Sequence, residues 1–245
     1  MTAATTQEIM ITAIAGMLGG LGHVAVGASS PIPGSAALLA RKRSQDRMRI
    51  SMLGSQSNNP FTDGGRELFD CAGQGRIDAF FLSGGQIDGH ANINLVGTGD
   101  IADYPRAAMR FPGSFGSAYL YFVVPRVILF REEHTPRTLV ERVDFISAPG
   151  TSPPDVVRTG GPHALVTSLC VFTFEKARAR FTLASTHPGV SAADVKAATG
   201  FDYDAAANVP VTPAPDAASL ALLRTEVARD VAETYPAFAR KVWGV

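Results

Sequence analysis

The stretch AFFLSGGQIDGHANINLVG, residues 79–97, decides the fold. Its apolar run, residues 79–82, stops at a serine followed by two glycines, a change typical of a buried strand that ends at a tight turn. After the turn, polar side chains alternate with small or apolar ones, so one face of the segment is polar. Ligands of open α/β sheets bind at the carboxyl ends of the strands. We therefore expect residues 83–94 to form one wall of a ligand site.

The chain before this stretch alternates between predicted strands and helices. Apolar periodicity predicts helices at residues 9–18, 35–42 and 67–72, and strands at residues 23–27, 49–53 and 77–82. Right-handed crossovers place such strands in one parallel sheet with their carboxyl ends at the same edge. The polar loop 54–60 and the segment 83–94 are therefore expected to converge at that edge.

The second half of the chain predicts further elements of the same kind. The glycine and serine turn at residues 110–117 offers backbone amides to an anion or an oxyanion. Strands are predicted at residues 127–130, 139–146, 164–174 and 180–185, a helix capped by Ser191 ends at Thr199, and a linker, 209–216, leads to a last helix at 218–234. We predict an α/β fold with an open, mostly parallel sheet and flanking helices, as a single domain of residues 1–245.

Composition excludes several classes of function. The chain has 22 basic and 22 acidic residues, which argues against nucleic acid as a partner. Cys71 and Cys170 are far apart and lack metal-ligand spacing, so we expect two buried thiols. The five histidines show no paired spacing, which predicts no metal site and points to surface or capping roles. The apolar segment 9–18 is too short to span a bilayer and follows Glu8, so we expect no membrane association and a cytoplasmic location.

Two catalytic motifs can be set aside. The run Gly19-Gly20-Leu21-Gly22 precedes a predicted strand, whereas a dinucleotide-binding turn follows one. No GxSxG motif occurs, and Ser55 and Ser57 have no local base, which argues against a serine hydrolase.

Four separated blocks resemble the β subunits of family I CoA-transferases, with the B subunit of glutaconate CoA-transferase as the most similar type. These blocks are GQGRIDAFFLSGGQIDGHANIN (73–94), RFPGSFGS (110–117), VERVDFISAPG (140–150) and HPGVSAADVKAATGF (187–201). The resemblance spans nearly the whole chain and implies a NagB/RpiA-like fold. It also implies an acyl-CoA substrate, which brings coenzyme A without a resident cofactor, and an α subunit as partner in a heterodimer or an α2β2 assembly.

The chain departs from that family where catalysis is expected. In typical members a glutamate after the strand that corresponds to residues 49–53 attacks the thioester and forms a covalent intermediate. The matching positions here are Gly54, Ser55 and Gln56, and no acid occurs between Asp46 and Asp63. We expect this chain alone not to run that transfer.

The resemblance therefore favours one activity and leaves two alternatives. Related two-subunit hydrolases of steroid catabolism cleave a C–C bond, with a carboxylate of the α-like subunit as base toward water. We predict a β subunit of that kind. The alternatives are conventional CoA transfer between an acyl-CoA and a carboxylate, and a non-catalytic chain that scaffolds an active α subunit.

The predicted substrate contacts lie in the two glycine-rich turns. We expect them to surround the thioester carbonyl and CoA: Gly84, Gly85, Gln86, Asp88, Asn92, Gly113, Ser114 and Gly116. The glycines equally suit tight packing, and Asp88 and Asn92 equally suit local capping of a turn. No residue is assigned to catalysis, although Gln56 and Asn58 stand where the attacking acid is expected and are candidates to orient water or a substrate carbonyl.

Overall fold

The computed structural model describes residues 3–45, 47–103 and 106–245, and the chain divides into two compact units. Unit 1 comprises residues 1–81 and 212–245, and unit 2 comprises residues 82–211. The predicted linker, 209–216, runs from unit 2 into unit 1. The single domain of residues 1–245 stays a prediction.

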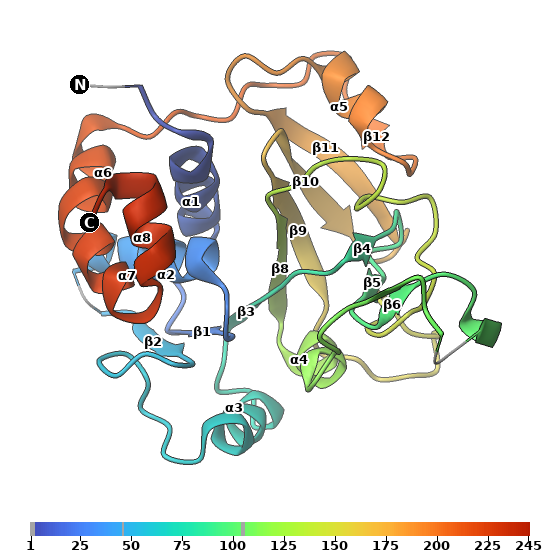
Figure 1. The fold of residues 1–245 in the computed structure, drawn as a ribbon, viewed down its shortest axis with the longest axis horizontal. Coiled ribbons are helices and arrows are strands. Elements are labelled where there is room, and N and C mark those ends of the chain that lie inside the picture. The colour runs from blue at the N-terminus through green and yellow to red at the C-terminus, as the bar shows by residue number, and fades with distance from the viewer. Residues whose placement is uncertain (1–2, 46, 104–105) are drawn as a thin grey trace. The chain divides into compact units, whose positions relative to one another are not determined.

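Unit 1 combines three short parallel strands with helices from both ends of the chain (Figure 1). Its elements are α1 (Thr6–Met17), β1 (His23–Val26), α2 (Pro31–Arg43), β2 (Arg49–Met52), α3 (Gly64–Gly73), β3 (Ala79–Leu82), α6 (Ala217–Leu222), a π-helical turn (Leu223–Val227), α7 (Ala228–Thr234) and α8 (Pro236–Trp243). The strand order is β3-β1-β2, and both neighbours of β1 run parallel to it. The strand and helix alternation predicted for residues 9–82 is therefore confirmed.

Local chemistry fixes the helix ends of unit 1. Thr5 and Glu8 form a reciprocal capping box at the start of α1, and Gly20, with a φ of 78°, lies in the turn that follows the helix. Helix α2 begins at Pro31, four residues before the predicted start at Ser35. The predicted helix began after the prolines, but a proline at the first helical position lacks only a donor that would be unpaired anyway.

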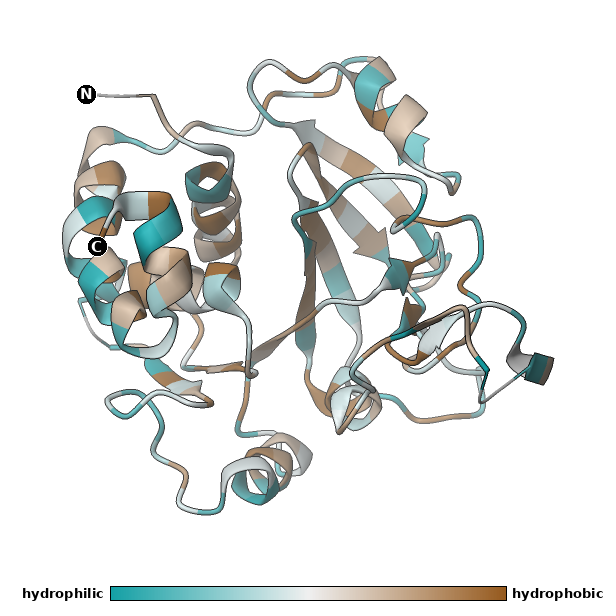
Figure 2. Ribbon diagram, in the orientation of Figure 1, coloured by the Kyte–Doolittle hydropathy of each residue, from teal (hydrophilic) through white to brown (hydrophobic). Residues whose placement is uncertain are grey.

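The C-terminal helices of unit 1 contact its N-terminal half through an ion pair with the buried carboxylate of Glu8. Arg224 donates to both carboxylate oxygens of Glu8, at 2.7 and 2.8 Å, and the Trp243 indole donates to the same carboxylate at 3.3 Å. The apolar residues of the predicted helix 218–234 are buried: Leu220, Leu223, Val227 and Val231. Figure 2 shows apolar and polar residues alternating along these helices. The prediction did not include α8.

Unit 2 is built on five strands in the order β12-β11-β10-β9-β8. Its elements are β4 (Gln86–Ile87), β5 (Ile93–Asn94), β6 (Gly97–Thr98), a 3-10 turn (Ile101–Asp103), β7 (Met109–Arg110), α4 (Ser117–Val123), β8 (Arg126–Arg131), β9 (Pro162–Thr167), β10 (Cys170–Glu175), β11 (Arg180–Thr186), α5 (Ala192–Ala198) and β12 (Asp204–Ala205). Pairings β8/β9 and β11/β12 are parallel, whereas β9/β10 and β10/β11 are antiparallel. With the parallel pairs of unit 1, this confirms a mixed, mostly parallel sheet with flanking helices.

Two strand predictions in unit 2 are wrong. Residues 139–146 form no strand beyond one isolated bridge from Leu139 to Ile87. Their amides instead bond to the 86–88 segment, since the Asp144 amide donates to the Gln86 side chain at 3.0 Å. The predicted strand 164–174 is two antiparallel strands, β9 and β10, because the chain turns at Ser168 and Leu169 between them.

Buried thiols and histidines occupy the cores of both units. Cys71 and Cys170 are free and buried, as predicted. The surface or capping role expected for histidines is wrong for His23, His134 and His187, which are all buried. The two ring nitrogens of His134 contact threonine hydroxyls at 2.7 and 2.9 Å, and these bonds satisfy the ring inside an apolar core. Within the part of the chain that the structure describes, no helix has the length and apolar character needed to cross a bilayer.

Candidate functional site

In unit 1 the candidate site is the loop 54–58, which follows β2. The Met52 amide donates to the Asn58 carbonyl at 2.8 Å, and the Ser55 amide donates to the Met52 carbonyl at 3.1 Å. These bonds fold the loop back on the strand that it leaves. Ser55 is buried, whereas Gln56 and Ser57 are exposed. The loop thus presents two consecutive polar residues at the carboxyl end of a parallel strand, where α/β sheets bind ligands.

A carboxylate from the other end of the chain contacts this loop. Glu233, in α7, accepts a hydrogen bond from the Ser55 hydroxyl at 2.8 Å. Its other oxygen accepts from the Gln56 amide at 2.5 Å and from the Ser57 amide at 3.1 Å. Partial burial raises the pKa of Glu233, but the hydrogen bonds from Thr234, Ser55 and the two amides outweigh it and lower the pKa below its ordinary value. Ser55 therefore has a carboxylate partner that the sequence did not reveal.

The two weak catalytic candidates differ in their surroundings. The Asn58 side-chain oxygen accepts from the Arg41 guanidinium at 2.7 Å, so Asn58 is fixed. Gln56 is exposed beside it. A cavity of about 350 Å³, partly lined by Arg41, Arg49 and residues 57–60, opens next to the loop. Two guanidinium groups at this cavity favour an anionic ligand, although the roles proposed for Gln56 and Asn58 toward water or substrate stay predictions.

In unit 2 the candidate site is the β4-β5 hairpin. Gln86 and Asn94 pair across it, and the Asn94 side-chain amide donates to the Gln86 side-chain oxygen at 2.7 Å. Gln86 is 6% exposed and Asn94 is fully buried. These two residues of the predicted polar face therefore point into the unit and bond to each other, whereas His90 on the same face is exposed. Contact of Gln86 with a substrate stays a prediction.

Asp88 holds the tip of the hairpin. One of its oxygens accepts from the amides of His90 and Asn92, each at 3.0 Å, and the other accepts from the Asn92 side chain at 3.1 Å. The Asn92 side-chain oxygen accepts from the Gly150 amide at 3.1 Å. Asp88 and Asn92 therefore cap the turn locally, which was the predicted alternative to a contact with substrate. Because Asp88 is only 2% exposed, its carboxylate has little surface for a ligand.

The structure brings the two predicted glycine turns together. A side chain at Gly85 would meet the Phe111 ring at 2.2 Å, and one at Gly84 would meet Ile93 at 2.6 Å. The amides of Gly85 and Gly113 donate to the carbonyls of Asn94 and Leu95, both at 2.9 Å. Close packing thus explains Gly84 and Gly85, and the bonded amides of Gly85 and Gly113 are not available to an oxyanion in this conformation.

The remaining predicted contacts lie on the exposed turn before α4. The Ser114 carbonyl accepts from the hydroxyl and the amide of Ser117, at 2.5 and 2.8 Å, and Gly116 is the residue that precedes the helix. Between them Phe115 is 86% exposed and has a φ of 43°, a conformation that non-glycine residues rarely adopt. Ser114 and Gly116 therefore flank a strained, accessible turn, and their contact with substrate stays a prediction.

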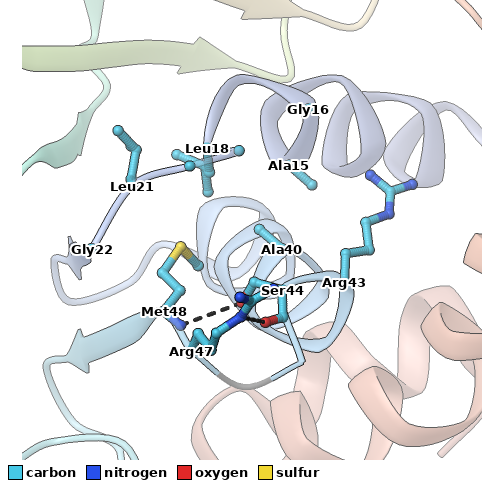
Figure 3. Close-up of a pocket in the computed structure, with 12 residues that line it drawn as sticks. Ala15, Gly16, Leu18, Leu21, Gly22, Ala40, Arg43, Ser44, Arg47 and Met48 are labelled. Atoms are coloured by element: carbon cyan, nitrogen blue, oxygen red, sulfur yellow. Dashed lines mark hydrogen bonds between the residues drawn. The ribbon is translucent and has the colours of Figure 1, made fainter.

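A larger cavity in unit 1 lies at the opposite ends of the strands. It measures about 650 Å³ and is lined in part by Gly22, which precedes β1, and by Met48, which precedes β2 (Figure 3). Arg43 and Arg47 also line it, but Arg43 donates to Ser219 at 2.5 Å and Arg47 donates to the Ser44 carbonyl at 3.0 Å. Since ligands of α/β sheets bind at the carboxyl ends, this cavity is not our candidate site.

Comparisons with known proteins identify the family of this chain. The coenzyme A transferase family profile matches residues 10–198. The chain is 31% identical to the B subunit of 3-oxoadipate CoA-transferase of Pseudomonas knackmussii, over 95% of this chain and 96% of the relative. It is 26% identical to the cholesterol ring-cleaving hydrolase IpdB subunit of Rhodococcus jostii, over 91% of this chain and 92% of the relative.

Two solved structures show the same fold. Rhodococcus jostii IpdAB superposes with a TM-score of 0.79 at 26% identity, covering 91% of this chain and 94% of the other. Glutaconate coenzyme A-transferase from Acidaminococcus fermentans superposes with a TM-score of 0.76 at 23% identity, again covering 91% and 94%. Because the family profile spans most of the chain and the transferase subunit is 31% identical along nearly all of it, this chain belongs to the coenzyme A transferase family of enzymes.

Proposed function

We propose that the chain is the β subunit of a heteromeric enzyme that binds an acyl-CoA thioester and cleaves a C–C bond with water, using a carboxylate of its α partner as base. The observation that carries this proposal is the loop after β2. Residues 54–62 contain no acid, and the carboxylate that contacts the loop, Glu233, already accepts hydrogen bonds on both oxygens. The loop therefore lacks an available nucleophile for covalent transfer.

The proposed step is a hydrolysis next to the thioester. The base takes a proton from water, the hydroxide adds to a ketone carbon, and the adjacent C–C bond breaks. The electron pair moves onto the α-carbon of the thioester, and the base returns its proton to the resulting enolate to give an acyl-CoA. The former ketone carbon leaves as a carboxylic acid, which ionises to a carboxylate. This sequence asks the β subunit for an oxyanion pocket rather than a nucleophile. The exposed turn at Ser114 and Gly116 is the candidate for that pocket.

A heteromeric partner is supported by the relatives. Two of them are themselves subunits, one of 3-oxoadipate CoA-transferase and one, IpdB, of a cholesterol ring-cleaving hydrolase. Because the carboxylate of this chain that contacts the loop, Glu233, is hydrogen-bonded on both oxygens, a second chain is needed to supply the base. The substrate is an acyl-CoA held by the complex, so coenzyme A arrives with the substrate and no permanent cofactor is invoked.

Conventional CoA transfer is the second candidate, because the 31% identical relative belongs to a 3-oxoadipate CoA-transferase. In that reaction the CoA moves to a free carboxylate and no water is consumed. Hydrolysis instead adds one oxygen from water to a product. A non-catalytic β chain that only scaffolds an active α subunit is a further alternative, and a complete active site within the α chain would favour it.

One experiment separates these activities. The chain is co-expressed with its α partner, and the complex is given candidate acyl-CoA esters in ¹⁸O-labelled water, with and without a carboxylate acceptor. Hydrolysis incorporates ¹⁸O into a new carboxylate without an acceptor, whereas transfer requires the acceptor. Parallel samples are treated with borohydride and digested, which converts an enzyme-bound glutamyl thioester to an alcohol that mass spectrometry locates. We expect no such adduct in this chain, and an adduct at Glu233 would refute the argument from the missing acid.

A further inference from the structure

The loop 54–58 contains no acid, yet α7 brings one to it. Glu233 is 178 residues away from Ser55 along the chain, and its carboxylate accepts from the Ser55 hydroxyl at 2.8 Å. It also accepts from the amides of Gln56 and Ser57. This is the loop at which the family resemblance places an attacking glutamate. One in-chain carboxylate therefore contacts the loop of the proposed site.

The hydrogen bonds of Glu233 decide between two roles for it. A carboxylate has about four acceptor positions. One oxygen accepts from the Gln56 and Ser57 amides, and the other accepts from the Ser55 hydroxyl and, at 2.6 Å, from the Thr234 hydroxyl. All four positions are in use. An attack on a thioester or on water would require these bonds to break, so the geometry favours a group that holds the loop over one that reacts.

The bonds continue from Glu233 through the loop to α2. The Ser55 oxygen accepts from the Asn58 amide at 2.9 Å, and the Asn58 side chain accepts from Arg41 at 2.7 Å. These contacts connect α7, the loop and α2 in one series. Among the hydrogen bonds described for the loop, the amides of the exposed residues Gln56 and Ser57 have no other charged acceptor. Their backbone conformation therefore depends on Glu233.

We propose that Glu233 is the positioning residue of the loop 54–58, so that the C-terminal helix of this chain fixes the loop that faces the acyl-CoA. The effect on turnover rests on the proposed function, whereas the effect on the loop does not. Substitution of Glu233 is expected to free the amides of Gln56 and Ser57. It is also expected to lower kcat more than it raises KM, because a misplaced loop disturbs the reacting geometry more than the binding of the distant CoA.

The test uses the complex of this chain with its α partner and three variants. Glu233→Ala removes all four bonds. Glu233→Gln keeps one carbonyl oxygen, which can still accept from the two amides, but removes the charge. The matched control is Glu226→Gln, in the π-helical turn that precedes α7, because the Glu226 carboxylate pairs with Lys42 at 3.0 Å and not with the loop.

Hydrogen–deuterium exchange of the amides of Gln56 and Ser57 is the first measurement. In Glu233→Ala we expect exchange at least about tenfold faster, the factor for loss of one hydrogen bond to a charged group. In Glu233→Gln it rises less than in Glu233→Ala, and in Glu226→Gln it stays at the wild-type rate. Unchanged exchange in Glu233→Ala would overturn the proposal, whatever the complex catalyses.

Steady-state kinetics is the second measurement. We expect kcat to fall by about tenfold to a hundredfold in Glu233→Ala, with KM changed by less than about threefold, and a smaller fall in Glu233→Gln. If Glu233→Gln protects the amides but abolishes turnover as fully as Glu233→Ala, Glu233 acts on the reacting atoms and the positioning role is wrong. If no acyl-CoA is turned over by the wild-type complex, the proposed function fails while the exchange measurement still tests the inference.

Discussion

Gly85→Ala separates close packing from substrate contact at the glycine turn of the hairpin. A Cβ at Gly85 would lie 2.2 Å from the Phe111 ring, so the ring must move by roughly 1 Å. Forcing such overpacking costs about 2 kcal/mol, and at about 2–4 °C per kcal/mol for a chain of this size the melting temperature should fall by about 4–8 °C.

The Phe111→Leu background supplies the control for this prediction. A leucine lacks the ring atoms that the new methyl group would meet, so Gly85→Ala should cost at least about 1 kcal/mol less there than in the wild type. Thermal unfolding of the heteromeric complex, followed by calorimetry at fixed subunit ratio, gives the four values. An equal cost of Gly85→Ala in both backgrounds contradicts the packing argument. Lost turnover with unchanged stability would instead identify Gly85 as a substrate contact.

Three further perturbations test the cores and the helix docking. Burial lowers the pKa of His134 to about 4 from 6.5, so the unfolded chain binds the proton first as pH falls. The stability that the neutral ring contributes is complete above pH 6.5, and up to about 3 kcal/mol of it is lost toward pH 4. His134→Gln should therefore flatten the dependence of melting temperature on pH in this range. Asp88→Asn keeps one oxygen for the amides of His90 and Asn92 but turns its NH2 group toward the donating Asn92 side chain, so it should destabilise by about 1–3 kcal/mol, measured by calorimetry. An unchanged melting temperature with lost turnover would assign Asp88 to the substrate. Glu8→Ala leaves Arg224 without this carboxylate and should destabilise the complex and speed amide exchange in α7. Unaltered exchange there would show that the pair does not dock the helix.

The sequence predicted the strands of unit 1 well because local patterns and short connections determine them. Strands β1, β2 and β3 lie within the predicted ranges, and the capping box at Ser191 begins α5 as expected. Residues 139–146 were misassigned because their apolar alternation matches packing against the β4-β5 hairpin, and alternation alone does not distinguish such a segment from a paired strand.

The candidate site was harder to predict, because side-chain direction decides it. Gln86 and Asp88 lie on the predicted polar face, but that face bonds internally across the hairpin and to the 143–150 segment. Glu233 was missed because its contact with Ser55 spans 178 residues and no spacing rule reports it. Within the sequence, Glu233 is one polar residue among several on an amphipathic helix.

The π-helical turn Leu223–Val227 sets where Glu233 points. Such a turn holds one more residue than a regular helical turn, so the side chains that follow it are rotated by about 100° around the helix axis. Deletion of one residue there, such as Thr225, would restore a regular helix with almost unchanged hydropathy, and it would turn position 233 away from the loop. Among related chains, the length of this turn should therefore vary together with the presence of an acid at position 233. The one-residue insertion and the distant acid should be inherited together.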